Sequence, residues 1–172
     1  MKKPTTFATI LFLLCSFRTL AQIKIKTDMV EINLPKSVTK TNISQIPIVD
    51  NDGTITSIPK PAYDYEGLGL NLSYGRLMGD TRFLAESKEA LDNRHNRYGH
   101  NNEYYFTEIK SNEKYIILIS RDRGWDNNCY LFYLVNKNFT YQVSGTLDFL
   151  PAEEVKAKKQ LDEILNSINI TN

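Results

Sequence analysis

Two segments in the second half of the chain, Tyr115–Ile119 and Tyr130–Val135, are apolar at every position. A strand with one wet face alternates apolar and polar residues, so a strand that is apolar throughout needs cover on both of its faces. These segments therefore predict central strands of a sheet that has other elements packed on each side.

Segments with alternating polarity predict the neighbouring strands of this sheet. Residues 139–149 alternate over their whole length, and shorter alternating runs cover Met29–Leu34 and Leu68–Tyr74. The sequence Asp50-Asn51-Asp52-Gly53 separates two short apolar runs, which predicts a hairpin with its turn at these residues. We expect antiparallel pairing in this sheet.

Two helices are expected to supply the cover. Asp80 can cap a helix that begins near Phe83 and ends near Gly99. A second helix follows Pro151, which suits a first helical position. Its expected buried stripe is Ala157, Leu161, Ile164, Leu165 and Ile168. The predicted fold class is α+β, with a single antiparallel β-sheet of five to seven strands packed with a mid-chain helix and a C-terminal helix on opposite faces.

The N-terminus has the pattern of a secretory signal peptide. Lys2 and Lys3 precede an apolar run from Phe7 to Phe17 that is shorter than the roughly 20 residues of a membrane-spanning helix. Thr19-Leu20-Ala21 offers small residues where a signal peptidase reads. We therefore expect a cleavable peptide at 1–21, one globular domain at 22–172 and a periplasmic or secreted location. Lipid anchoring through Cys15 is disfavoured, since Leu14 rather than a small residue precedes it.

Composition limits the partners of this domain. Removal of residues 1–21 leaves 18 basic and 20 acidic residues, a formal net charge of about −2. A charge balance of this kind gives no reason to expect nucleic-acid binding or an anionic membrane surface as partner. Cys129 would be the single cysteine left, so an intramolecular disulfide is excluded for the cleaved chain. We expect no transmembrane helix in it.

The C-terminal third resembles a known family. Residues 138–146 form a strand with the sequence NFTYQVSGT, and the helix after it ends in Ile164-Leu165-Asn166-Ser167-Ile168. This combination is similar to the ending of PsbP-like and DcrB-like proteins, whose opening strand resembles Val30–Pro35. The resemblance implies an antiparallel sheet between helices, export, and an accessory or partner-binding role. It implies no catalytic residues.

The segment between the two apolar strands is the first candidate binding site. Residues 121–128 read RDRGWDNN and contain the one tryptophan of the chain. A loop held by stiff strands is a common place for binding residues, and tryptophan and arginine dominate interface hot spots. Arg121, Arg123 and Trp125 are therefore the candidate contact residues. In the alternative interpretation, Trp125 packs back on the sheet and serves stability.

The second candidate segment holds both histidines. Arg94, His95, Arg97 and His100 would form a phosphate or metal site, with the histidines as base or ligands. Histidines five residues apart do not share a helical face, and no third ligand has suitable spacing. The favoured interpretation of the segment is therefore the basic end of a helix followed by a solvated loop.

Other residues with chemical potential have structural interpretations. Cys129 begins an apolar strand, where a thiol is usually buried and inert. Asp50–Gly53 faintly resembles a calcium loop, but Pro61 stands where an EF-hand requires glutamate. We expect no metal, no cofactor and no catalytic residues.

Three functions remain open. The first is a non-enzymatic accessory or binding protein of the bacterial envelope that binds another protein or a small amphiphilic ligand. The second is a periplasmic immunity or inhibitor protein that blocks a toxin. The third is a small hydrolase with a site near His95 and His100.

The signal-peptide interpretation makes a direct prediction. Expression of the full chain in a bacterium should yield a protein that begins at Gln22, because cleavage follows Ala21. N-terminal sequencing of protein recovered from the envelope tests this. A start at Met1, or a lipid on Cys15, would contradict it.

Overall fold

The computed structural model describes residues 22–41, 45–49, 55–59, 61–77, 79–98, 104–123 and 127–170, with only the backbone described at 45–49 and 55–59. The predicted signal peptide and the turn at Asp50–Gly53 lie outside these residues. The cleavage site and the 22–172 domain boundary therefore stay predictions. Among the described helices, none is long and apolar enough to span a bilayer.

The fold class is α+β, as predicted. The strands are β1 (Lys24–Lys26), β2 (Val30–Asn33), β3 (Val38–Lys40), β4 (Gln45–Val49), β5 (Ile55–Pro59), β6 (Tyr63–Tyr65), β7 (Leu68–Arg76), β8 (Phe106–Ser111), β9 (Tyr115–Arg123), β10 (Asn128–Asn136), β11 (Tyr141–Phe149) and β12 (Ile168–Ile170). The helices are α2 (Phe83–Tyr98), the short 3₁₀ helix η2 (Pro151–Glu153) and α3 (Glu154–Ser167). The predicted hairpin at 46–58 is present as the antiparallel pair of β4 and β5.

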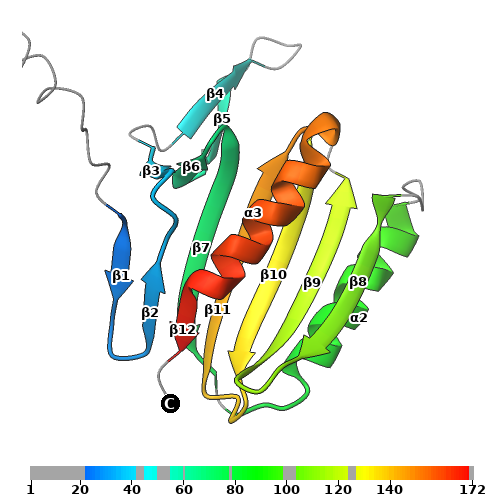
Figure 1. Ribbon diagram of the computed structural model, residues 1–172. Helices are drawn as coiled ribbons and strands as arrows, with labels where there is room; N and C mark the ends of the chain where they lie inside the picture. The colour runs from blue at the N-terminus through cyan, green and yellow to red at the C-terminus, as the bar shows by residue number, and fades with distance from the viewer. Residues whose placement is uncertain are drawn as a thin grey trace, which may run out of the picture.

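The main sheet has seven strands in the order β3-β6-β7-β11-β10-β9-β8, and every pair is antiparallel. Figure 1 shows α3 crossing one face of this sheet and α2 lying behind the opposite face at β8. The two segments that are apolar throughout lie within β9 and β10, which have a helix on each side, as their composition predicts. They are not both central, because β9 lies next to the edge strand β8.

The larger core lies under α3. Phe132 and Leu134 of β10 and Leu147 of β11 are fully buried there against Leu161 and Ile164 of the helix. The smaller core lies under α2, where Leu84 and Leu91 pack on Leu118 and Val135. Since α2 contacts β8 and β9, neither of the two described α-helices lies over the face of β7 and β11 on the α2 side.

A three-stranded sheet, β1-β2-β12, adds to the predicted architecture. The sequence analysis assigns Ile168 to the C-terminal helix, but the helix ends at Ser167 and Ile168 begins β12, opposite Ile32 of β2. The prediction was wrong here because β12 is only three residues long and follows the helix without a break. Ile168 is buried in β12, and an apolar residue at this position also continues the helical stripe, so the apolar pattern cannot distinguish helix from strand here.

Two glycines are required by the backbone of this sheet. Gly67 has φ +93° beside Glu66 at φ 54°, and two residues with positive φ make the tight turn that joins β6 to β7. At Gly145 of β11, a Cβ atom would lie 2.6 Å from the ring of Phe132. Phe132 can therefore lie flat against β11 only because residue 145 has no side chain.

The packing of α3 predicts that truncation of its buried side chains lowers stability, whereas truncation of its exposed side chains does not. Ile164→Ala should lower the free energy of unfolding by roughly 2–5 kcal/mol, because Ile164 is fully buried and leaves a cavity. Val155→Ala on the same helix is the control, since Val155 is 87% exposed and should change stability by less than about 0.5 kcal/mol. Urea unfolding of both variants measures the difference, and equal effects would contradict the position of α3.

Candidate functional site

The two segments singled out from the sequence meet at one end of the main sheet. The C-terminus of β9, the N-terminus of β10, the start of β8 and the C-terminus of α2 all lie at this end (Figure 1). The loop between β9 and β10 is shorter than predicted, because β9 continues through Arg123 and β10 begins at Asn128. We call Arg94, Arg97, Arg121 and Arg123 the arginine end.

Arg121 is held in place from three sides. Its Nε–H donates a hydrogen bond to the carbonyl oxygen of Tyr104 at 2.6 Å, and its guanidinium pairs with the Glu154 carboxylate at the start of α3. The guanidinium also lies over the ring of Phe106, 5.3 Å from its centroid. With only 17% of its side chain exposed, Arg121 joins α3 to the β8–β9 edge. Its predicted role as a contact residue is untested.

Arg123 lies two residues further along β9 and on the same face as Arg121. It is exposed, and its guanidinium lies 5.3 Å from the centroid of the Tyr104 ring. A cation over an aromatic face is attracted by the ring and remains accessible to an anion from its other side. Trp125, the third candidate of this segment, lies outside the described residues.

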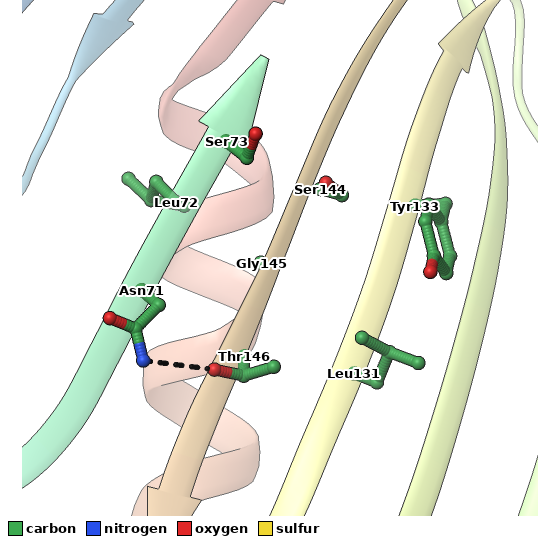
Figure 2. A pocket seen from close by; sticks show the side chains of 8 residues that line it. All are labelled: Asn71, Leu72, Ser73, Leu131, Tyr133, Ser144, Gly145 and Thr146. Carbon is green, nitrogen blue, oxygen red and sulfur yellow. Dashed lines mark hydrogen bonds between the residues drawn. The ribbon is translucent and has the colours of Figure 1, made fainter. Parts of the chain in front are cut away.

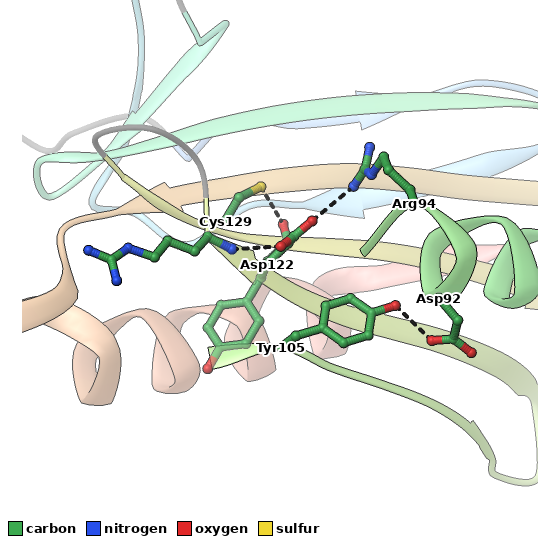
Figure 3. A network of polar contacts seen from close by, with 7 residues as sticks. Asp92, Arg94, Tyr105, Asp122 and Cys129 are labelled. Carbon is green, nitrogen blue, oxygen red and sulfur yellow. Dashed lines mark hydrogen bonds and ion pairs between the residues drawn. The ribbon is translucent and has the colours of Figure 1, made fainter. Parts of the chain in front are cut away.

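An ion pair connects the two candidate segments. Arg94 of α2 approaches the Asp122 carboxylate of β9 at 3.2 Å (Figure 3), and the other Asp122 oxygen accepts the Arg123 backbone N–H at 2.8 Å. Arg94 is more than half exposed. Arg97, one turn further along α2, is exposed as well. Among the described residues, no carboxylate lies within ion-pair distance of Arg97 or Arg123.

His95 serves the packing of α2. It is 4% exposed and stacks on the Tyr105 ring with a centroid distance of 3.9 Å. A ring buried in this way is not presented to a substrate in solution. His100 lies outside the described residues. The described part of the chain contains no group of three or more His, Cys, Asp or Glu side chains placed to hold a metal ion.

Asp92 fastens the same helix to β8. Its carboxylate accepts hydrogen bonds from the Tyr105 and Thr107 hydroxyls, both at 2.7 Å, and from Lys88 at 2.6 Å (Figure 3 shows the Tyr105 contact). Burial alone would raise the pKa of Asp92, but these hydrogen bonds from Lys88, Thr107 and Tyr105 outweigh it and lower the pKa below its usual range. The arginine end is thus carried by a helix that is pinned to the sheet.

Cys129 has an environment opposite to that of a nucleophilic thiol. Burial raises its pKa far above the usual value, and the nearby Asp148 and Asp122 carboxylates raise it further. Burial also raises the pKa of Asp148 itself. The thiolate is the reactive form of cysteine, so this site suppresses reactivity.

Two hollows lie on the main sheet, and Arg121 lines the first of them. A cleft of about 150 Å³ between α3 and the β8–β9 edge has Phe106, Tyr130 and Leu161 among its walls and Lys158 and Asp162 at its rim. A hollow of about 200 Å³ lies on the sheet face beside α2 (Figure 2), where Asn71 Nδ2 donates to the Thr146 hydroxyl at 3.3 Å. Small polar side chains line this second hollow together with Leu131 and Tyr133.

Sequence reasoning missed three residues that organise the arginine end. Tyr104 and Tyr105 lie between the two candidate segments, Tyr104 contacting the β9 arginines and Tyr105 contacting α2. Asp122 accepts the ion pair from Arg94. The adjacent tyrosines after a polar segment were the available signal, since paired aromatic side chains at the start of a strand reach opposite faces.

No protein-family model matches the sequence, and the search of curated proteins finds no match. Among solved structures, the fold is similar to cyanobacterial PsbP (CyanoP) from Synechocystis sp. PCC 6803, with a TM-score of 0.49 and 8% identity over 91% of this chain and 96% of that chain. PsbP is one of the two families that the C-terminal third resembles, and the DcrB-like resemblance stays a prediction. A likeness at this level carries no function or partner over to this chain.

The environment of Cys129 predicts slow alkylation. Iodoacetamide should modify Cys129 at least about 10-fold more slowly in the folded protein than in urea at the same pH, because burial and two carboxylates disfavour the thiolate. Mass spectrometry of the peptide that contains Cys129 measures both rates. Equal rates would contradict the buried position of this thiol.

Proposed function

We propose that this protein is a non-enzymatic binding protein of the bacterial envelope, and that it binds an acidic protein partner through the arginine end. The observation that carries the proposal is that α2 and β9 bring four arginines to the same end of the sheet. Arg94 and Arg97 are carried by α2 on one face, and Arg121 and Arg123 project from β9 on the α3 face. Two of them, Arg94 and Arg121, are paired with carboxylates, whereas Arg97 and Arg123 are exposed and have none within reach among the described residues.

The chemistry of arginine supports an acidic partner. The planar guanidinium donates two parallel hydrogen bonds to a carboxylate and is more weakly hydrated than an ammonium group, so arginine suits ion pairs at interfaces. Three of the four arginines already have fixed contacts, because Tyr104 contacts Arg121 and Arg123 and Asp122 pairs with Arg94. Ordering of the surface on binding would therefore cost little.

The positive charge of the arginine end is local and is not a property of the whole chain. The sequence without residues 1–21 has a net charge of about −2, so the arginine end is a local concentration of positive charge on a slightly acidic molecule. Such a molecule is steered toward its partner by one end only. Nucleic acid is disfavoured as partner because the overall charge would oppose it.

The expected envelope location rests on the signal-peptide pattern of residues 1–21. A toxin-blocking immunity protein would use the same surface against an acidic toxin, and the identity of the captured partner separates it from an accessory protein. The hydrolase alternative is weakened by the burial of His95 under Tyr105.

A second candidate function is the binding of a small amphiphilic ligand in the cleft beside α3. Its walls combine the Phe106 and Tyr130 rings with the Arg121–Glu154 ion pair and with further charged side chains, which suits an amphiphilic ligand whose polar part is the larger one. A volume of about 150 Å³ limits such a ligand to a small molecule or to one end of a larger one.

The arginine end predicts a charge-reversal experiment. The double variant Arg97→Glu/Arg123→Glu should lose the partner that the wild-type protein retains from an envelope extract, and should weaken binding to that purified partner by roughly 30-fold or more, as expected when hot-spot contacts are lost. Because both residues are exposed, the melting temperature should stay near the wild-type value.

Lys24→Glu/Lys26→Glu is the matched control. It changes the net charge by the same amount on the exposed strand β1, away from the arginine end (Figure 1). Retention of the same partner by both double variants would refute the proposed site. Trp125→Ala, measured for binding and melting together, tests whether the tryptophan belongs to this surface.

A further inference from the structure

The outer edge of β8 is the longest exposed strand edge of the two larger sheets. The other terminal strands, β1, β3 and β12, have three residues each, whereas β8 has six. Very short edge strands offer little backbone to another chain, and natural sheets use them to avoid edge-to-edge pairing. No described strand pairs with β8 on the side away from β9, so its backbone groups on that side are available.

The side chains of β8 do not protect this edge from pairing with another strand in the way that side chains of one charge would, by repelling a second copy. Glu108 and Lys110 lie on the α3 side of the strand and pair with each other at 2.6 Å, so their charges cancel. Ile109 between them is 42% exposed and is one of only four large exposed hydrophobic residues in the described part of the chain. An exposed isoleucine on a neutral edge favours association.

We infer that two copies of this protein associate through β8, antiparallel, about a two-fold axis that passes through Ile109. In this register Glu108 of each copy lies opposite Lys110 of the other, and Thr107 lies opposite Ser111. Residues opposite each other in an antiparallel pair share a face, so the two charge pairs form on the α3 side. The two Ile109 side chains meet at the axis.

The charges specify this register. A shift that brings the axis to Glu108 sets two carboxylates opposite each other, and a shift to Lys110 sets two ammonium groups opposite each other. Like charges directly opposite are destabilising in a sheet. Self-complementary surfaces of this kind are what a two-fold dimer requires, because each copy supplies both halves of every contact.

The dimer has a consequence for the other surfaces. The two arginine ends would lie at opposite ends of a continuous fourteen-stranded sheet, since the strands of the two copies run antiparallel across the axis. The clefts beside α3 would lie on the same face, one on each side of the axis. The inference does not depend on the proposed function, because none of the four arginines belongs to β8 and the axis passes through Ile109, three residues beyond the Phe106 that Arg121 contacts.

A charge-swap series tests the dimer. The full chain is expressed, the naturally processed protein is purified, and its mass is measured by sedimentation equilibrium from micromolar to millimolar concentration. The wild-type protein should dimerise in this range. Glu108→Lys or Lys110→Glu alone should raise the dissociation constant at least about 10-fold by opposing like charges, and Glu108→Lys/Lys110→Glu should restore it. Ile109→Lys should give a monomer with a melting temperature close to that of the wild type, since Ile109 is exposed.

Three results would overturn the inference. If the wild-type protein is a monomer at every concentration, the β8 edge does not pair with a second copy of this chain. A dimer that both single variants leave unchanged would place the interface elsewhere. Weakened association in a folded double variant would show that the two charges are not opposite each other.

Discussion

The neighbouring strands β9 and β10 carry apolar side chains on both faces, and water must be kept from each face. On one face α3 covers Phe132 and Leu134, and on the other α2 covers Leu118 and Val135. Other features of the architecture serve the burial of these two faces. Gly145 lets Phe132 reach β11, and Asp92 fastens α2 over β8 and β9. A single helix would leave one half of this core in contact with solvent.

The arginine end also results from the placement of one helix on each face of β9 and β10. Because α2 and α3 both end or begin where β9 ends, charged residues from three elements are brought together there, with Glu154 against Arg121 and Asp122 against Arg94. These pairs are partly exposed, and such pairs contribute little to stability. Their effect is to orient the arginine side chains, whose directions cannot be predicted from their positions in the sequence.

Long periodic elements could be predicted from the sequence, whereas short ones and long-range contacts could not. The alternation of residues 139–149 indicates β11, and the apolar runs indicate β9 and β10. The three-residue strands β3, β6 and β12 are too short for a period to show. Arg121 and Arg123 could be chosen as candidates by residue type, but their contacts with Tyr104 depend on the pairing of β8 with β9, which no local pattern specifies.

The pairing of β2 with β12 joins the beginning of the described chain to its end, and β7 pairs with β11 across the segment that holds α2, β8, β9 and β10. Neither pairing can form until β12 or β11 has been synthesised, long after β2 and β7. Folds with such distant contacts also form slowly, because long loops must close first. We propose that this chain is exported across a membrane through a channel that admits only extended polypeptide. Late formation of the sheet would keep the nascent protein unfolded, and so able to enter the channel, until export is under way.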